Sequence, residues 1–133
     1  MSSATGADLL LIDTDVLIDY LRDQPGAVAF LEAHEGPMAV SVITVAELHA
    51  GVRDGEERQR LSDFLEAFEL IALERSAAAQ AGLWRRDFGR SHGTGLADAL
   101  IAATAFRLGA TLVTLNRRHF PMIERLLVPY TKP

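Results

Sequence analysis

Cysteine is missing from all 133 residues, and its absence excludes several kinds of chemistry. No disulfide framework, thiolate metal site or cysteine nucleophile can form. Lysine is nearly absent as well, because the single Lys132 stands next to the carboxyl terminus. From there it cannot serve a phosphate-binding loop that leads into a helix, so a Walker-type nucleotide site is excluded.

Long apolar runs are also lacking. A membrane-spanning helix needs roughly 20 predominantly apolar residues, and no stretch of the sequence approaches that length. The first basic residue is Arg22, so the amino-terminal stretch has neither the charged start of a secretory signal nor the arginine-rich character of a transit peptide. We therefore expect no membrane segment and a cytoplasmic location.

What is present is an ordinary globular composition, with 49% hydrophobic and 23% charged residues. A chain of this length can bury one core, so we expect a single domain over residues 1–133. Residues 1–71 carry 14 acidic and 4 basic side chains, whereas residues 72–133 carry 4 acidic and 9 basic ones. The second half can therefore present a basic surface to an anionic partner although the net charge is −5.

Strand and helix patterns alternate along the chain. Such alternation predicts right-handed crossovers and a parallel sheet that is covered on both faces, which is a three-layer α/β/α sandwich. The first helix is expected to present Asp19 to solvent. The predicted strands cover residues 9–12, 38–43, 70–73 and 110–115, and the predicted helices cover residues 16–21, 27–34, 45–52, 61–68, 76–88 and 96–108, with a loop over 89–95.

Polar side chains follow the predicted strands where a functional groove is expected, at the carboxyl ends. Asp13 follows the first strand, and Glu47 lies in the first turn after the second. Asp98 opens the helix before the last strand, and Asn116 follows that strand. Carboxylates held close together repel one another unless a cation neutralises them, and hard cations such as Mg²⁺ or Mn²⁺ prefer oxygen ligands.

Each of these residues also has a purely structural interpretation. Asp13 fits a helix N-cap, and Thr44 with Glu47 fits a capping box. Asp98 suits the positive end of a helix dipole, and Asn116 suits a turn. Capping does not, however, require four such residues at the same edge of one sheet, so the group as a whole favours a site.

Four segments carry a family resemblance that spans nearly the whole chain. They resemble, in order and spacing, the motif blocks of PIN-domain ribonucleases and, more narrowly, of the VapC toxins of bacterial type II toxin–antitoxin systems. The segments are LLIDTDVLID at 10–19, SVITVAEL at 41–48, LADALIAATA at 96–105 and LVTLNRRHFP at 112–121.

The resemblance implies a metal site. In that family the acids of the first three blocks bind a divalent cation, which carries over to Asp13, Glu47 and Asp98. Many members place a further acid in the fourth block, where this chain has Asn116 and His119. An amide oxygen is a neutral and weaker ligand, so this departure leaves the number of metal ions, one or two, open.

The resemblance also implies an activity and partners. It implies Mg²⁺- or Mn²⁺-dependent hydrolysis of phosphodiester bonds in structured RNA, usually transfer or ribosomal RNA, without a protein nucleophile. It further implies a cognate VapB-type antitoxin whose carboxyl-terminal segment fills the active-site groove, and a homodimer. Which RNA is cut cannot be inferred from the sequence, because loop recognition depends on base-edge and stacking geometry.

Two alternatives compete with this interpretation. The pattern Asp13-Thr14-Asp15 also resembles the opening motif of haloacid-dehalogenase-like phosphatases, but those enzymes need a lysine beside the phosphoryl group and Lys132 is badly placed for it. The other alternative is a non-catalytic, PIN-like RNA-binding module in which Asn116 marks a lost ligand. Binding of Mn²⁺ separates this module from an active nuclease.

Overall fold

Five parallel strands form the central sheet of the computed structural model, which describes residues 9–132. The strands are β1 (Leu10–Ile12), β2 (Met38–Ser41), β3 (Glu69–Ile71), β4 (Thr111–Val113) and β5 (Leu126–Leu127). Their order is β3-β2-β1-β4-β5, so the chain builds outward from β1 first on one side and later on the other. In parallel sheets with such a reversal, ligands generally bind beside the carboxyl ends of the strands at the point of reversal, which here is next to β1.

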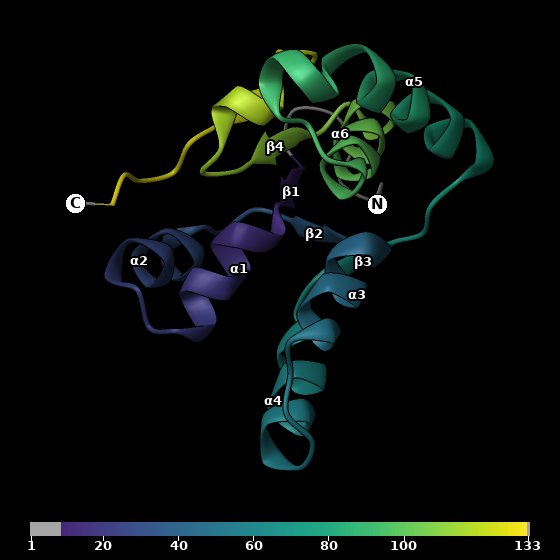
Figure 1. Cartoon of the computed structure of the whole chain (residues 1–133). Coiled ribbons are helices and arrows are strands. Elements are labelled where there is room, and N and C mark those ends of the chain that lie inside the picture. The colour runs from purple at the N-terminus through teal and green to yellow at the C-terminus, as the bar shows by residue number, and fades with distance from the viewer. Residues whose placement is uncertain (1–8, 133) are drawn as a thin grey trace, which may run out of the picture.

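Helices cover both faces of the sheet. They are α1 (Thr14–Leu21), α2 (Pro25–Ala33), α3 (Val42–Ala50), α4 (Glu56–Leu65), α5 (Arg75–His92) and α6 (Leu96–Leu108), with a short 3₁₀ helix, η2 (Arg117–His119). Figure 1 shows α1 and α2 on one side of the sheet, α5 and α6 on the other, and α3 with α4 extending away from both. This arrangement confirms the predicted three-layer α/β/α sandwich. No helix within residues 9–132 is long and apolar enough to cross a membrane.

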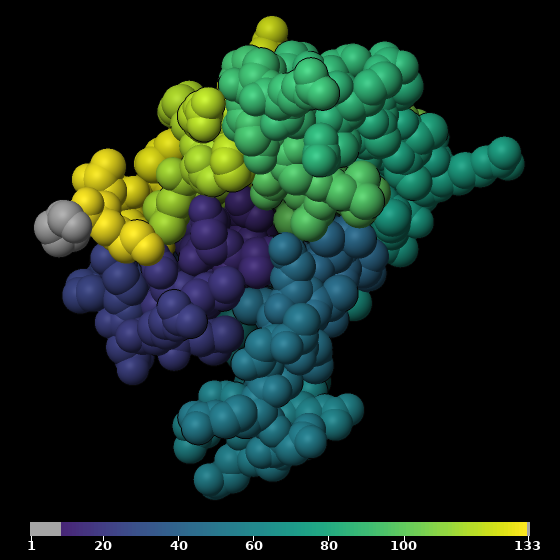
Figure 2. All heavy atoms as spheres, viewed as in Figure 1, coloured from purple at the N-terminus to yellow at the C-terminus, as the bar shows by residue number. Residues whose placement is uncertain are grey.

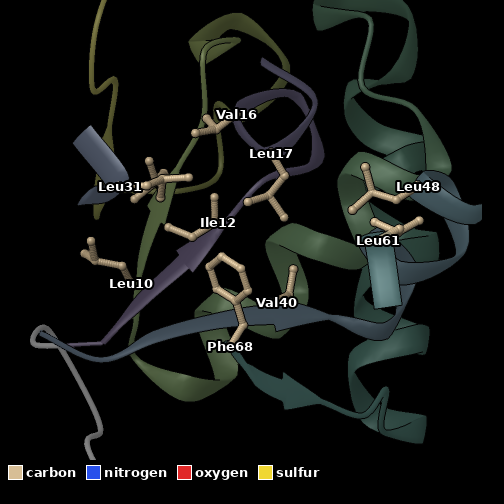
Figure 3. Close-up of a cluster of buried hydrophobic side chains, with 10 residues drawn as sticks. Leu10, Ile12, Val16, Leu17, Leu31, Val40, Leu48, Leu61 and Phe68 are labelled. Atoms are coloured by element: carbon tan, nitrogen blue, oxygen red, sulfur yellow. The ribbon is translucent and has the colours of Figure 1, made fainter. Parts of the chain in front are cut away.

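The core has two parts because β1 is apolar on both faces. Leu10 and Ile12 point into one cluster, whereas Leu9 and Leu11 point into the other, as the period of two in a strand requires. Figure 3 shows the first cluster, where side chains from α1 to α4 gather over β1 and β2. On the opposite face, α6 packs on the sheet, and α5 packs closely on α6 through alanines. The four consecutive apolar residues at 9–12 are thus explained by a strand that is buried on both faces.

The strand predicted over residues 38–43 is two residues too long, since α3 begins at Val42. The Ser41 side chain accepts a hydrogen bond from the Ile43 N–H at 3.0 Å and caps the helix. The β-branched residues Val42 and Ile43 therefore enter a helix in spite of their preference for strands.

The predicted loop over residues 89–95 is also too long, because α5 continues to His92. Gly89 lies inside the helix, and Gly93 ends it at φ 70°, a left-handed conformation that glycine adopts without steric cost. The expected strand at 70–73 lies instead at Glu69–Ile71. Neither η2 nor β5 was predicted, because elements of two or three residues carry no periodic signal.

Asp19 does not face solvent as predicted; the residue is buried, with 7% of its surface exposed. Its carboxylate accepts a hydrogen bond from the Tyr130 hydroxyl at 2.9 Å and forms an ion pair with Lys132 at 3.1 Å. Both partners lie more than 100 residues further along the chain. The carboxyl-terminal segment therefore covers a face of α1 that looks exposed from the local pattern.

Candidate active site

Asp13 directly follows β1, at the edge of the sheet where the carboxyl ends of β1 and β4 lie side by side. The register pairs Ile12 with Val113, so Asp13 and Thr114 leave neighbouring strands side by side. The Thr114 hydroxyl donates to Asp13 Oδ2 at 2.7 Å, and the Thr14 N–H donates to Oδ1 at 2.8 Å. The second contact makes Asp13 the N-cap of α1, which confirms the structural interpretation of this residue. The two hydrogen bonds together fix the orientation of its carboxylate.

Burial makes the charge of Asp13 costly. Asp13 is only 5% exposed, and its pKa is raised from 3.8 to about 7. Burial is the largest cause, the negative charges of Asp15 and, more weakly, Asp98 act in the same direction, and the hydrogen bonds from Thr114 and Thr14 oppose the rise. The site therefore contains a carboxylate that a cation would strongly stabilise in its charged form.

Glu47 approaches this centre from α3. Its Oε1 accepts a hydrogen bond from the Thr14 hydroxyl at 2.6 Å, and Thr14 also lies 3.0 Å from the Thr44 hydroxyl. The predicted capping box of Thr44 and Glu47 is wrong, because Ser41 caps α3 and Thr44 is buried inside the helix. Glu47 thus has no capping role and is free to serve the site.

Asp98 and Asn116 meet through a histidine. His119 Nδ1 lies 3.1 Å from Asp98 Oδ2 and 2.9 Å from the Asn116 side-chain amide. Asp98 Oδ2 also accepts the Gly95 N–H at 3.0 Å, and the residue lies in the first turn of α6, at the positive end of the helix dipole as expected. The Thr94 hydroxyl donates to the His119 carbonyl at 2.7 Å and holds η2 against this helix start.

One network of hydrogen bonds joins these groups. The Asn116 N–H donates to Thr114 Oγ1 at 3.1 Å, which links the histidine side of the site to Asp13. The structure therefore brings the four predicted residues to one edge of the sheet. The network runs, in order, through Glu47, Thr14, Asp13, Thr114, Asn116, His119 and Asp98.

Sequence reasoning did not include two residues at the centre of this network. Thr114 was placed inside the strand predicted over residues 110–115, whereas β4 ends at Val113, so Thr114 directly follows β4 as Asp13 follows β1. Asp15 was considered only as part of a phosphatase-like motif, yet its Oδ2 accepts the Leu115 N–H at 3.0 Å. Burial raises the pKa of Asp15 as well.

The donor set is suited to a hard divalent cation, because all the acidic donors are oxygens. Among residues 9–132, no three acidic or histidine side chains form a ready-made ligand group. Mg²⁺ does not require one, since it commonly binds one or two carboxylates and keeps several waters. Asp13 and Asp98, whose charges repel at this edge, fit that requirement, and the ligand set that includes Glu47 stays a prediction.

Basic side chains lie on α5 and on η2, the short helix whose His119 contacts Asp98. Arg85, Arg90 and Arg117 form no ion pair with any residue of the described chain, and Arg118 donates to the Ser91 carbonyl at 3.3 Å. Figure 2 shows the purple segment that contains β1 and α1 between the blue residues of α3 and the green residues of α5 and α6. The segments that carry the acidic residues and the arginine-bearing helix α5 thus lie in one view of the molecule.

Comparisons with known proteins agree with this geometry. The family model of the PIN domain matches residues 10–126. Ribonuclease VapC10 of Mycobacterium tuberculosis is 41% identical over 128 residues, covering 94% of this chain and 96% of that protein. Ribonuclease VapC19 of the same species is 38% identical over 124 residues, with coverages of 90% and 98%. A toxin–antitoxin complex from Klebsiella pneumoniae contains a chain that is 30% identical, with coverages of 91% and 98% and a TM-score of 0.78.

Proposed function

This chain belongs to the PIN-domain family, and we propose that it is a metal-dependent endoribonuclease that acts as the toxin of a VapBC-type pair. One observation carries the proposal: the buried Asp13 is held by two hydrogen bonds and has no cationic partner within the described residues, and Asp98 adds negative charge nearby. An uncompensated acidic centre at the carboxyl edge of a parallel sheet is a cation site rather than a structural ion pair.

The proposed mechanism assigns a task to each residue. Asp13 and Asp98 hold the cation, with Glu47 as a third ligand. A Mg²⁺ or Mn²⁺ ion held there would supply Lewis-acid chemistry, lowering the pKa of a water and offsetting negative charge on the phosphate. Thr114 and Thr14 fix the rotamer of Asp13 through the hydrogen bonds described above. No lysine or cysteine is needed, which is consistent with their near absence from the sequence.

The proposed substrate is a structured RNA, and the basic surface supports this choice. Nucleic acids bind arginine through their phosphates, and an arginine that is not paired with a carboxylate keeps its full charge for that contact. Arg85, Arg90 and Arg117 meet this condition within residues 9–132. We assign transfer or ribosomal RNA as the substrate class on family resemblance.

The proposed protein partner is an antitoxin, because a solved structure with a chain 30% identical to this one is a toxin–antitoxin complex. A groove of about 330 Å³ runs between α1, α3 and α4 and includes Glu47 in its lining. Leu21, Leu48 and Leu61 supply apolar walls, and Arg60 lies at the same groove. An amphipathic segment with a basic side chain could fill this groove and reach the acidic centre.

We also propose that the chain forms a homodimer. Large apolar side chains are exposed on α5 and α6, including Leu83 at 46%, Leu96 at 55% and Phe106 at 61%. Apolar patches of this kind favour association between copies. Sedimentation of the isolated protein as a monomer at micromolar concentration would contradict the proposal.

A non-catalytic RNA-binding module is the second candidate, favoured by Asn116 in the fourth block and by the lack of a ready-made three-ligand group within residues 9–132. Calorimetric titration with Mn²⁺ separates the two candidates. An active nuclease binds the ion, and Asp98→Asn weakens binding. A lapsed site binds equally poorly in both proteins. The phosphatase alternative has no support, since Lys132 is paired with Asp19 rather than with Asp13.

The proposed activity is tested by mapping new RNA ends that carry a 5′ phosphate, after brief expression in cells and again with purified protein and total RNA. Cleavage should require Mg²⁺ or Mn²⁺, stop with EDTA and disappear in Asp98→Asn. The matched control is Asp87→Asn, which removes an exposed carboxylate on the neighbouring helix α5. If Asp98→Asn produces the same ends as the wild type, the assignment of this residue fails.

A further inference from the structure

Asp15 is an acid of the site region that the proposed mechanism does not use. It lies in the first turn of α1, two residues after Asp13. Its Oδ1 is buried and has no hydrogen-bond partner in the described structure. Burial and the charge of Asp19 both oppose its ionisation. A side chain with these costs is expected to have a compensating role.

The other oxygen of Asp15 ties two distant segments together. Oδ2 accepts the Leu115 N–H at 3.0 Å and lies 3.3 Å from the Thr114 hydroxyl oxygen. The start of α1 is thereby fastened to the turn after β4, about 100 residues further along the chain. An acid that only favoured the helix dipole would not need these contacts.

The hydrogen bonds of Thr114 show which side chain depends on this contact between Asp15 and Leu115. Its hydroxyl has one hydrogen, and the shorter contact, 2.7 Å against 3.3 Å, directs that hydrogen to Asp13 rather than to Asp15. Asp15 thus fixes the backbone next to Thr114, while Thr114 itself holds Asp13. The same turn carries Asn116, whose N–H donates to the Thr114 oxygen at 3.1 Å.

We propose that Asp15 is a positioning residue for the reaction, which rests on the proposed ribonuclease function: it anchors the turn after β4 so that Thr114 orients Asp13. The acceptor oxygen performs this task, and the negative charge of Asp15 is not required. Outer-shell partners that orient metal-binding side chains commonly account for about 10- to 100-fold in activity or metal affinity.

Two substitutions separate the acceptor from the charge. Asp15→Ala removes the acceptor, and kcat for RNA cleavage should fall about 10- to 100-fold with KM unchanged. Asp15→Asn keeps an oxygen for the Leu115 N–H, and kcat should stay within about threefold of the wild type. The matched control is Asp19→Asn, a buried carboxylate on the same helix whose hydrogen-bond partners in the described structure are Tyr130 and Lys132 rather than the turn, and its kcat should be unchanged.

A double-mutant cycle tests whether Asp15 acts through Thr114. Thr114→Val keeps the shape of the side chain and removes the hydroxyl. If the two residues form one path to Asp13, the Asp15→Ala/Thr114→Val protein should be about as active as Thr114→Val alone. If the activity losses of the two single substitutions multiply in the double variant, Asp15 does not act through Thr114, and the proposal is overturned.

Hydrogen exchange gives a readout that does not depend on RNA cleavage. The Leu115 N–H should be protected in the wild type and in Asp15→Asn, and should exchange at least tenfold faster in Asp15→Ala while the strand amides stay protected. If Asp15→Ala fails to fold by circular dichroism, Asp15→Ser, which is too short to reach Leu115, takes its place.

Each result decides the question. The proposal is overturned if Asp15→Asn loses as much activity as the truncation while Leu115 stays protected, since the charge would then be required. It is also overturned if the truncation has wild-type kcat or leaves Leu115 protected. If the wild type cleaves no RNA, the ribonuclease function fails, and the exchange experiment still shows whether the tie exists.

Discussion

Two carboxylates on the same helix, Asp13 and Asp19, are buried to a similar extent and have opposite surroundings. Asp13 is 5% exposed and Asp19 is 7% exposed. Asp19 receives the ammonium of Lys132 and the hydroxyl of Tyr130 from the carboxyl-terminal segment. Asp13 receives only hydrogen bonds from a hydroxyl and a backbone N–H, and further acids surround it.

The difference separates an acid that is satisfied within the fold from the acid that we propose binds metal. A buried charge with its own cation is satisfied within the fold, and removing its partner costs stability. A buried charge without a cation raises the energy of the unliganded fold, a cost that a bound divalent ion can offset. Position in the sequence does not separate the two residues, because both belong to the same short segment of acids.

The largest expected effect comes from removing the charge of the functional acids. Asp13→Asn and Asp98→Asn should each lower RNA cleavage by about 1,000-fold or more with the fold retained, because both keep the shape of the side chain. Asp19→Asn should stay within about threefold of the wild type. Initial rates on one defined RNA, with circular dichroism for folding, check the comparison, and equal losses at all three positions would break it.

The next largest effect is on stability, and it tests whether Lys132 compensates the buried charge of Asp19. Lys132→Met leaves the Asp19 carboxylate buried without its cation and should lower the free energy of unfolding by about 1–2 kcal/mol, a modest value because the lysine side chain is half exposed. Cleavage activity should not change. In urea unfolding, Asp19→Asn/Lys132→Met should cost less than the sum of the single substitutions.

A smaller effect concerns pH in the absence of metal. The pKa of Asp13 is about 7 in the folded chain against 3.8 as its ordinary value, so the folded state holds a proton that the unfolded state has released between these pH values. The stability that the protonated Asp13 contributes should therefore be full at or below about pH 4 and be lost as the pH rises to about 7. In EDTA, Asp13→Asn should flatten this decrease and raise the thermal midpoint at pH 8 by about 5 °C.

A divalent metal ion should have the opposite effect on the difference in thermal midpoint between the wild type and Asp13→Asn. At pH 8, millimolar Mg²⁺ should raise the thermal midpoint of the wild type, because the ion binds the folded state. It should have little effect on Asp13→Asn. A pH dependence in EDTA that is the same in both proteins would assign the titration to another group.

The smallest effect is expected at Asn116. If this residue contributes a weak ligand, Asn116→Asp should tighten Mn²⁺ binding, and Asn116→Ala should weaken it less than Asp98→Ala does. If it only shapes the turn with His119, which its side chain contacts at 2.9 Å, the Asn116 variants should bind Mn²⁺ like the wild type. Calorimetry on these variants decides between the two roles.

The sequence alone determined the layers and the positions of the main acids. β1 and the start of α1 are encoded locally, because an apolar run that ends in an aspartate followed by a helical pattern specifies both elements. The convergence of Asp13, Asp98 and Asn116 then follows from a general property of parallel sheets, whose strands all end at the same edge. None of these inferences required a contact between particular distant side chains.

Tertiary structure decided which polar groups touch. Thr114 holds Asp13, and Asp15 holds Leu115, only because β1 and β4 pair in one register across about 100 residues. Asp19 is buried only because the end of the chain returns to α1. A periodic pattern reports the face of an element on which a residue lies, but a hydrogen bond depends on the register and proximity of segments that the pattern does not connect.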